Sequence, residues 1–214
     1  MRPKFLFFDV GETMVSEHRM WSQWAEWLEV PEPTFFAALG ATIAERRHHT
    51  EVFGYFREPF DLAAERAARH RAGVPDGFAV SDLYPDTLPA LRWAQEAGYR
   101  IGFAGNHSME TEGFLHMLGV EAEIVGSAQG WGVEKPAVGF FEKIVSLTGL
   151  APAEIAYVGD RIDDDVLPAL AAGLQAVFIR RGPWGVVQSA WPEAQHAPVK
   201  VDNLSELTEV LEAV

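Results

Sequence analysis

The sequence has 214 residues, enough for one large domain or for a core domain that carries an insertion. Hydrophobic residues make up 48% and charged residues 22%, as in ordinary globular proteins, and the absence of cysteine excludes disulfides, thiolate metal sites and cysteine nucleophiles. The formal net charge of −14 argues against a protein that binds duplex nucleic acid, which needs a basic surface, whereas an anionic substrate can still bind where a local cation or a metal offsets the field.

A short strand is predicted near the N-terminus, where residues 5–8 form an apolar run that stops at Asp9 and Gly11. This run is too short for the core of a signal peptide, which needs about 7–15 apolar residues. No other segment approaches the roughly 18 apolar residues of a membrane span. We therefore expect a soluble, cytoplasmic protein without a membrane partner.

The next segment, residues 14–80, has the pattern of an all-helical insertion. Tryptophans recur at helical spacing in its first part, a second periodic stretch contains Phe35 and Ile43, and its last part is rich in alanine and arginine. Glycine and proline at 73–77 end the insertion with turn chemistry. Helices are predicted at residues 21–28, from about Thr34 to His48, and at 61–71.

Helices and strands alternate in the rest of the chain, which predicts a parallel sheet with helices on both faces. We expect an α/β fold with a doubly wound, Rossmann-like, mostly parallel sheet in residues 1–13 and 81–214, and an all-helical domain in 14–80. The predicted helices cover residues 85–98, 109–118, 138–148 and 166–172, with a last one from Asn203. The predicted strands after the first cover residues 99–104, 122–125, 155–158 and 175–179.

Polar residues follow these strands at the edge where an open parallel sheet binds ligands. Asp9 follows the first strand, Gly105 and Asn106 end the second, and Asp160 follows the fourth. Lys135 lies in a loop after the third strand. Two carboxylates and one ammonium at one edge predict a site for a divalent metal and a phosphate, because hard cations prefer oxygen ligands and a lysine neutralises a phosphoryl group.

The order and spacing of several motifs resemble those of the haloacid dehalogenase-like (HAD) hydrolase superfamily. The resemblance covers nearly the whole chain and implies a sheet core with a helical cap inserted after the first strand. The matching segments are residues 7–13 (FFDVGET), 83–85 (LYP), 101–106 (IGFAGN), 134–136 (EKP), 158–165 (VGDRIDDD) and 171–174 (AAGL).

The resemblance also implies a role for each matching residue. Asp9 would be the nucleophile that forms an aspartyl intermediate, and Lys135 would hold both this nucleophile and the transferring phosphoryl group. Gly105 and Asn106 would join Lys135 in substrate binding. The implied Mg²⁺ site consists of Asp9, the backbone carbonyl of Gly11, Asp160, and the acidic pair Asp164 and Asp165.

Two positions depart from the family pattern. Gly11 stands where the family's phosphatases carry a second aspartate as general acid and base, and Gly105 stands where a serine or threonine binds a phosphoryl oxygen. Since general acid–base help is worth roughly 10²–10⁴-fold, we expect a preference for good leaving groups, a surrogate proton donor, or slow turnover. The surrogate candidates are Glu12, His18 and His107.

The favoured function is Mg²⁺-dependent hydrolysis of a small phosphorylated metabolite by a monomer or homodimer. One alternative is a metal-independent 2-haloacid dehalogenase that uses Asp9, which Gly11 favours but which the acids from Asp160 onward disfavour, because they would repel an anionic substrate. The other alternative is a phosphate- or metal-binding protein with weak turnover, in view of Gly11 and Gly105.

The remaining charged and aromatic clusters have structural explanations that we favour. The three tryptophans at 21, 24 and 27 are predicted to belong to a core or an interface. The basic segments 46–49 and 66–71 are predicted to be solvated helix faces. Asp163 is expected only to cap a helix. Arg161, Arg180 and Arg181 lie near the ligand-binding edge and could bind an anion or form salt bridges.

Overall fold

The computed structural model describes residues 2–74 and 76–212. The chain divides into two compact units, one formed by Met1–Ser16 with Ala79–Val214 and the other by Glu17–Phe78. The sequence-based boundaries, 13/14 and 80/81, lie a few residues from these. No helix in the described parts of the chain is both long enough and apolar enough to cross a bilayer.

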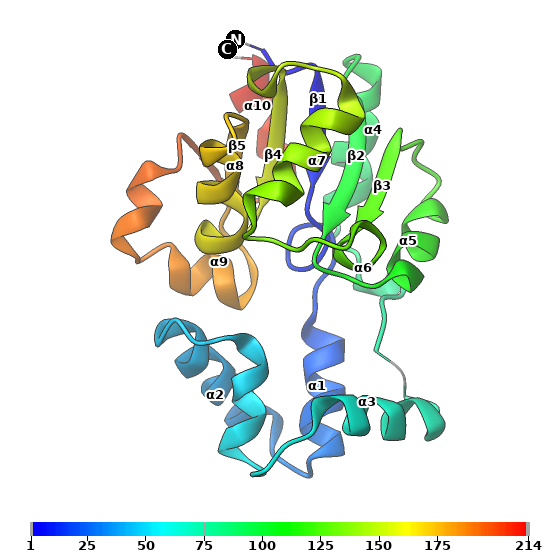
Figure 1. The fold of residues 1–214 in the computed structure, drawn as a ribbon, viewed down its shortest axis with the longest axis vertical. Coiled ribbons are helices and arrows are strands. Elements are labelled where there is room, and N and C mark those ends of the chain that lie inside the picture. The colour runs from blue at the N-terminus through cyan, green and yellow to red at the C-terminus, as the bar shows by residue number, and fades with distance from the viewer. Residues whose placement is uncertain (1, 75, 213–214) are drawn as a thin grey trace. The chain divides into compact units, whose positions relative to one another are not determined.

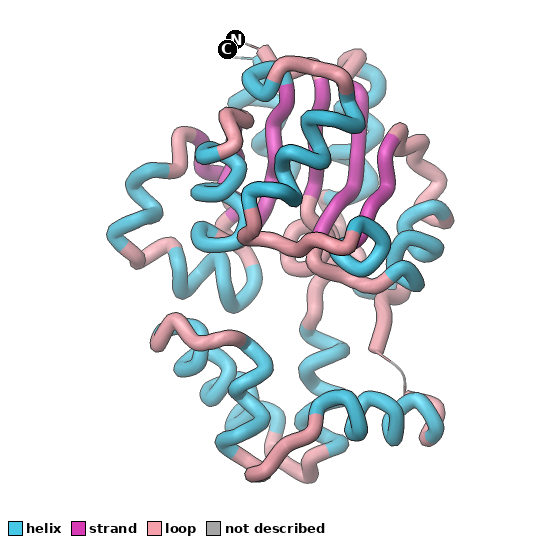
Figure 2. The backbone as a smooth tube through the Cα atoms, in the orientation of Figure 1, coloured by secondary structure: helices cyan, strands magenta, loops and turns pink. Residues whose placement is uncertain are grey.

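A six-stranded sheet forms the centre of the first unit, in the order β3-β2-β1-β4-β5-β6 (Figures 1 and 2). All neighbouring strands are parallel, which confirms the predicted Rossmann-like α/β fold. The apolar run at 5–8 becomes β1, a fully buried inner strand whose Phe8 is aligned with Phe103 of β2 and Val158 of β4. The strands are β1 (Phe5–Phe8), β2 (Arg100–Gly105), β3 (Ile124–Ser127), β4 (Ile155–Gly159), β5 (Gln175–Ile179) and β6 (Val199–Val201).

Helices cover both faces of this sheet, with α7 and α8 on one face and α4 and α10 on the other (Figure 1). On the first face, Phe140 and Phe141 of α7 are fully buried, and the ring of Phe141 meets that of Tyr157 from β4 edge-on. The helices of this unit are α4 (Thr87–Glu96), α5 (Met109–His116), α6 (Ala128–Trp131), α7 (Val138–Thr148), α8 (Leu167–Ala171), α9 (Gly182–Gln188) and α10 (Leu207–Glu212).

The two segments that connect the inserted unit to the sheet-containing unit pair with each other. Val15 and Leu83 form an antiparallel bridge. The amide of Ser16 donates to the carbonyl of Asp82 at 2.8 Å, and the amide of Tyr84 donates to that of Met14 at 3.0 Å. Residues 14–16 and 82–84 therefore form a short antiparallel ladder that belongs to the sheet-containing unit.

The inserted unit is helical and has an aromatic core of its own. Trp24, Phe35 and Phe53 are buried, and the ring centroids of Trp24 and Phe53 are 4.7 Å apart. Trp21 is also buried, so the core prediction is confirmed for two of the three tryptophans. The unit contains α1 (His18–Trp27), α2 (Glu32–Ala44), a 3₁₀ helix (His49–Tyr55) and α3 (Leu62–Arg71).

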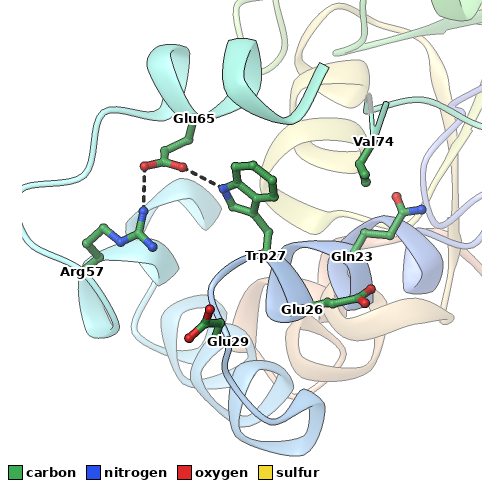
Figure 3. Close-up of a pocket in the computed structure, with 7 residues that line it drawn as sticks. All are labelled: Gln23, Glu26, Trp27, Glu29, Arg57, Glu65 and Val74. Carbon is green, nitrogen blue, oxygen red and sulfur yellow. Dashed lines mark hydrogen bonds and ion pairs between the residues drawn. The ribbon is translucent and has the colours of Figure 1, made fainter. Parts of the chain in front are cut away.

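The third tryptophan, Trp27, lines an open pocket of about 450 Å³ within the helical unit (Figure 3). Its indole N–H donates to Glu65 at 2.7 Å, and Arg57 donates to the other oxygen of Glu65 at 2.7 Å. Trp27 is thus half-buried and held by a surface ion pair instead of being packed in the core.

Arg69 contradicts the prediction of a solvated basic face on α3. Its side chain is fully buried, its guanidinium carbon lies 3.9 Å from the centroid of a Trp24 ring, and it forms an ion pair with Asp76. The prediction of a solvated side chain is wrong for Arg69, because cation–π stacking and a carboxylate partner allow a charged side chain to be buried. The basic segment at 46–49 is largely exposed, but it forms a turn and the start of the 3₁₀ helix instead of a helix face.

Several element boundaries also differ from the predicted ones. Helix α2 begins after Pro31, not near Thr34, and ends at Ala44, because Arg46 adopts a left-handed conformation with φ of 60°. Strand β3 begins two residues later than predicted. The predicted helix at 166–172 is preceded by a π-helical turn, Ile162–Val166. Helix α9 and strand β6 were not predicted.

Candidate active site

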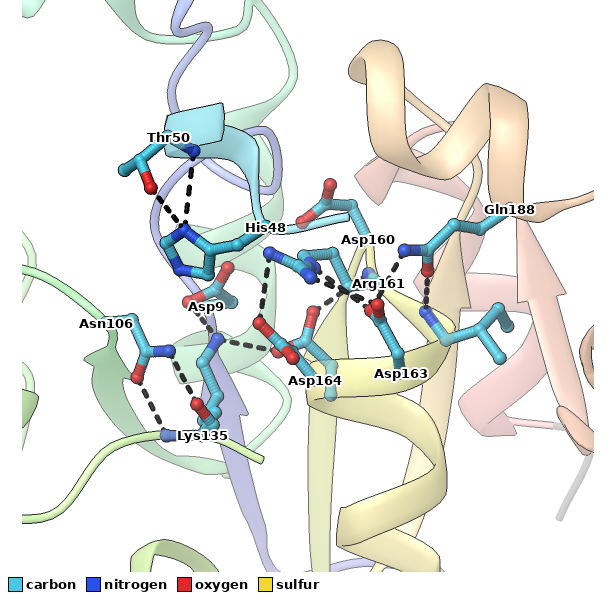
Figure 4. Close-up of polar contacts among 12 residues, drawn as sticks. Asp9, His48, Thr50, Asn106, Lys135, Asp160, Arg161, Asp163, Asp164 and Gln188 are labelled. Atoms are coloured by element: carbon cyan, nitrogen blue, oxygen red, sulfur yellow. Dashed lines mark hydrogen bonds and ion pairs between the residues drawn. The ribbon is translucent and has the colours of Figure 1, made fainter. Parts of the chain in front are cut away.

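Lys135 connects two acidic segments at the carboxyl edge of the sheet (Figure 4). Its Nζ donates to Oδ1 of Asp9 at 2.7 Å and to Oδ1 of Asp165 at 2.6 Å. Asp9 directly follows β1, and its amide extends the ladder by donating to Val158 at 2.9 Å. All three side chains are buried. Burial lowers the pKa of Lys135, but Asp165 and Asp9 outweigh this effect and raise the pKa well above its ordinary value, so the ammonium stays charged.

Asn106 fixes the loop that presents this lysine. Its side-chain amide donates to the carbonyl of Lys135 at 2.9 Å, and its Oδ1 accepts from the amide of Lys135 at 2.8 Å. Both polar ends of the Asn106 side chain are therefore engaged with the backbone of Lys135. The structure brings Asn106 into the site as an anchor for Lys135, and the predicted role of Asn106 in substrate binding stays a prediction.

Three buried acids could hold a metal ion. Asp9, Asp160 and Asp165 each offer one carboxylate oxygen, and these oxygens all lie within 4.8 Å of one another. Oδ2 of Asp160 is buried and accepts no hydrogen bond from the described residues. Burial raises the pKa of Asp160 well above its ordinary value, and the charges of Asp165 and Asp9 add to the shift. A hard divalent cation would bind the Asp160 oxygen that lacks a hydrogen bond and would offset the repulsion among the three carboxylates. The residues present therefore fit Mg²⁺.

The acids after Asp160 separate into two groups within a π-helical turn, Ile162–Val166. Asp165 turns toward Lys135, and its other oxygen accepts from the amide of Arg161 at 2.9 Å. Asp164, which the family resemblance implied for the metal shell, pairs with the guanidinium of Arg161 at 3.0 Å. Asp163 also accepts from that guanidinium, at 3.0 Å, so the expectation that it only caps a helix is wrong.

Gly105 makes room for the carboxylate of Asp9. A Cβ atom at position 105 would overlap Oδ1 of Asp9 and would lie 3.2 Å from Cδ2 of His107. The absence of a side chain at position 105 therefore has a structural effect, because the Asp9 carboxylate occupies the space that a Cβ atom would take. Gly11 lies in the loop after β1, where it forms a bridge with Val15.

The three candidates for a surrogate proton donor lie in different surroundings. Glu12 is buried, has a left-handed backbone with φ of 51°, and accepts a hydrogen bond from the hydroxyl of Tyr84. Burial lowers the pKa of His107 to about 4, so its imidazole is neutral near pH 7. His18 belongs to the helical unit, where it pairs with Glu32 at 3.3 Å.

The arginines near this edge form ion pairs inside the sheet-containing unit. Arg181 donates to both oxygens of Asp86, at 3.0 and 2.6 Å, and Arg180 pairs with Asp202 at 2.7 Å. Arg161 pairs with Asp163 and Asp164 of the turn Ile162–Val166, which we call the acidic turn. These contacts support the salt-bridge explanation that the sequence left open. Tyr84 belongs to the matching segment 83–85 but received no role from the sequence, and Gln188 received none, because no local pattern shows that their side chains reach Glu12 and Asp163.

Replacing Lys135 with methionine should destabilise the metal-free protein by about 3–5 kcal/mol, because two buried carboxylates lose their counter-charge. Added Mg²⁺ should raise the melting temperature of this variant more than that of the wild type, since the cation then supplies the missing positive charge. Circular dichroism melting with and without Mg²⁺ measures both effects. The matched control is Lys143→Met on an exposed part of α7, which should melt like the wild type. Equal melting of the two variants would contradict the prediction.

Comparison with known protein families matches residues 3–173 to the haloacid dehalogenase-like hydrolases. The chain belongs to this hydrolase family, as its motifs implied. Among curated proteins it is 32% identical to a glyceraldehyde 3-phosphate phosphatase of Methanopyrus kandleri over 59% of this chain and 54% of that protein. It is 29% identical to the enolase-phosphatase E1 of Gluconobacter oxydans over 55% of this chain and 53% of that protein. The chain thus spans little more than half the length of these relatives.

Solved structures share the fold at lower identity. A structure described as a predicted phosphoglycolate phosphatase from Haemophilus somnus matches with a TM-score of 0.70 and 18% identity, over 98% of both chains. A structure described as a dehalogenase matches with a TM-score of 0.66 and 21% identity, over 97% of this chain and 96% of that one. The same architecture therefore occurs in structures described as a predicted phosphatase and as a dehalogenase, so the fold alone does not define the reaction.

Proposed function

We propose that this protein is a Mg²⁺-dependent phosphohydrolase that acts on a small phosphorylated metabolite through an aspartyl-phosphate intermediate. The observation that carries the proposal is the bridge from Lys135 to Asp9 and Asp165 beside the unsatisfied oxygen of Asp160. This arrangement combines a nucleophile, a fixed positive charge and a buried oxygen cluster suited to a divalent cation. The phosphatase names of the relatives support the same chemistry.

The proposed reaction has two displacements at phosphorus. In the first, a carboxylate oxygen of Asp9 forms a bond to phosphorus, and the bond to the leaving oxygen breaks with its electron pair. In the second, a water oxygen forms a bond to phosphorus, the bond from phosphorus to the Asp9 oxygen breaks with its electron pair, and the carboxylate, inorganic phosphate and a proton released to solvent are the products. Lys135 orients Asp9 and offsets negative charge on the phosphoryl oxygens in both steps.

Asp9, Asp160 and Asp165 would hold the metal, with the backbone carbonyl of Gly11 as a further ligand. Mg²⁺ bound there offsets charge on the phosphoryl group as a Lewis acid. Asp164 would contribute only by giving up its ion pair with Arg161. In this proposal the helical unit is the cap that selects the substrate.

The test compares several substrates with Mg²⁺ and with EDTA. We expect hydrolysis of p-nitrophenyl phosphate and acetyl phosphate that stops in EDTA and returns with added Mg²⁺. Glycerol 2-phosphate should be hydrolysed about 10²-fold more slowly, because Gly11 provides no proton for an alkoxide. Halide release from 2-chloropropionate in EDTA would favour the dehalogenase. The observation that keeps this alternative open is Gly11, which provides no acid, because a halide leaves without being protonated. Phosphate or Mg²⁺ binding without any turnover would favour a binding protein.

A further inference from the structure

Helix α9 contacts the acidic turn but lies outside the sequence motifs of the family. It spans Gly182–Gln188, directly after β5, whereas the match to the family ends at residue 173. Gln188 contacts Ile162 and Asp163 of the turn Ile162–Val166, and Trp184 contacts Arg161, the residue just before it. This turn carries Asp165 into the three-acid cluster. The contacts of α9 are therefore a property of this chain that the family motifs do not describe.

Gln188 satisfies the first amide of the turn. Its Oε1 accepts from the backbone N–H of Ile162 at 2.6 Å, and its Nε2 donates to Oδ1 of Asp163 at 2.9 Å (Figure 4). Both Gln188 and Ile162 are buried, with exposed fractions of 1% and 0%. Because an amide left unpaired at a buried helix start is costly, Gln188 favours the observed start of this turn.

The start of the turn at Arg161 holds the backbone on which the three acids lie. The carbonyl of Arg161 accepts from the amide of Asp165 at 3.1 Å, four residues on, and from the amide of Val166 at 3.0 Å, five residues on, which is the π-helical spacing. With this winding Asp165 faces Lys135, while Asp163 and Asp164 face the guanidinium of Arg161. The direction of Asp165 therefore depends on how the turn starts at Arg161 and Ile162, which is where Gln188 binds.

A second contact from α9 holds Arg161. The guanidinium carbon of Arg161 lies 5.8 Å from the ring centroid of Trp184, and Trp184 lies four residues before Gln188, on the same helix face. Gly185 lets this helix sit close to the end of β5, because a Cβ atom there would lie 2.9 Å from the carbonyl oxygen of Ile179. Helix α9 is thus fixed on the sheet while one face contacts the acidic turn.

We infer that α9 braces the acidic turn and that Gln188 is a positioning residue that sets the affinity of the three-acid cluster for a divalent cation. The inference rests on the proposed function only in taking Mg²⁺ as the ion. Gln188 acts through Ile162 and Asp163, and through the turn it aligns Asp165 with Asp9 and Asp160.

The test measures Mg²⁺ affinity directly by isothermal titration calorimetry, with melting followed in parallel. Gln188→Leu keeps much of the side-chain volume and removes both hydrogen bonds, so it should raise the Kd for Mg²⁺ about 10-fold or more, as loss of groups that orient metal ligands usually does. Gln188→Glu keeps the acceptor for Ile162 but sets a carboxylate against Asp163, and it should also raise the Kd. This second variant carries the test if the first one does not fold.

Two controls separate positioning from loss of stability. Val186→Ala changes an exposed residue of α9, and Ile144→Val removes a methyl group from the core; both should keep the Kd of the wild type. A Gln188 variant that folds and binds Mg²⁺ like the wild type would overturn the inference alone, as would an equal rise in Kd for Ile144→Val. A wild type that binds Mg²⁺ but hydrolyses no phosphate would overturn the proposed function alone. A wild type that does not bind Mg²⁺ would overturn both.

Discussion

Replacing Asp9 with asparagine should abolish phosphate hydrolysis while the fold is retained. The amide has nearly the same shape as the carboxylate but cannot attack phosphorus, so kcat should fall by about 10³-fold or more. Lys135 keeps its second partner, Asp165, at 2.6 Å, and this contact should keep its loop in place. Initial rates on p-nitrophenyl phosphate measure the loss.

The chemical role of Asp9 can be separated from a structural one. Acid quenching during turnover of acetyl phosphate, followed by mass spectrometry, should find a phosphorylated peptide containing Asp9 in the wild type and none in the variant. Asp202→Asn, which makes the same change in an exposed ion pair with Arg180, is the matched control and should keep full activity. Turnover by Asp9→Asn at the wild-type rate would exclude Asp9 as the nucleophile.

Replacing Gly105 with serine should lower activity although it restores the residue type typical of the family's phosphatases. A Cβ atom at this position overlaps Oδ1 of Asp9, so either the Asp9 carboxylate or the end of β2 has to move. Because displacement of a reacting group by about 1 Å can cost 10²-fold, we expect kcat/KM on p-nitrophenyl phosphate to fall by roughly that factor.

The control for this prediction is Gly113→Ser. Gly113 lies on an exposed turn of α5 where an added Cβ atom meets nothing within 4 Å, so activity should not change. A gain of activity in Gly105→Ser would show that a serine at this edge binds the phosphoryl group without disturbing Asp9. The two outcomes have opposite signs, so a single pair of rate measurements decides between them.

The sheet and its ligand-binding edge could be predicted because their signals are local. The first strand is wholly apolar and stops at Asp9, and helices and strands alternate after residue 85, which together define a parallel sheet and its carboxyl edge. Lys135 and Asp160 could be placed at this edge for the same reason. The structure confirms this architecture and brings both residues close to Asp9.

Helix α9 and strand β6 could not be predicted in the same way. Helix α9 contains two glycines and a proline in seven residues, which is a poor helix-forming composition, so tertiary contacts through Trp184 and Gln188 stabilise it. Strand β6 has only three residues and an exposed lysine at its centre, which gives almost no periodic signal.

The different partners of the three adjacent acids could also not be predicted from the sequence. Asp163, Asp164 and Asp165 are adjacent, and which of them faces the cluster depends on how the turn that carries them is wound. The sequence contains no signal for that winding, because the partner that favours it, Gln188, lies more than 20 residues further along the chain. The burial of Arg69 was hidden for a similar reason, since its carboxylate partner and its aromatic neighbour both lie outside its own helix.

The short ladder between residues 14–16 and 82–84 makes the helical unit equivalent to the loop of a β-hairpin. A hairpin tolerates loops of very different length because the energetic cost of closing a loop grows only slowly with its length. The whole insertion could therefore be exchanged or excised by recombination at Ser16 and Asp82 without a change in the register of the sheet. Such modularity would allow specificity to diverge while the catalytic scaffold stays constant.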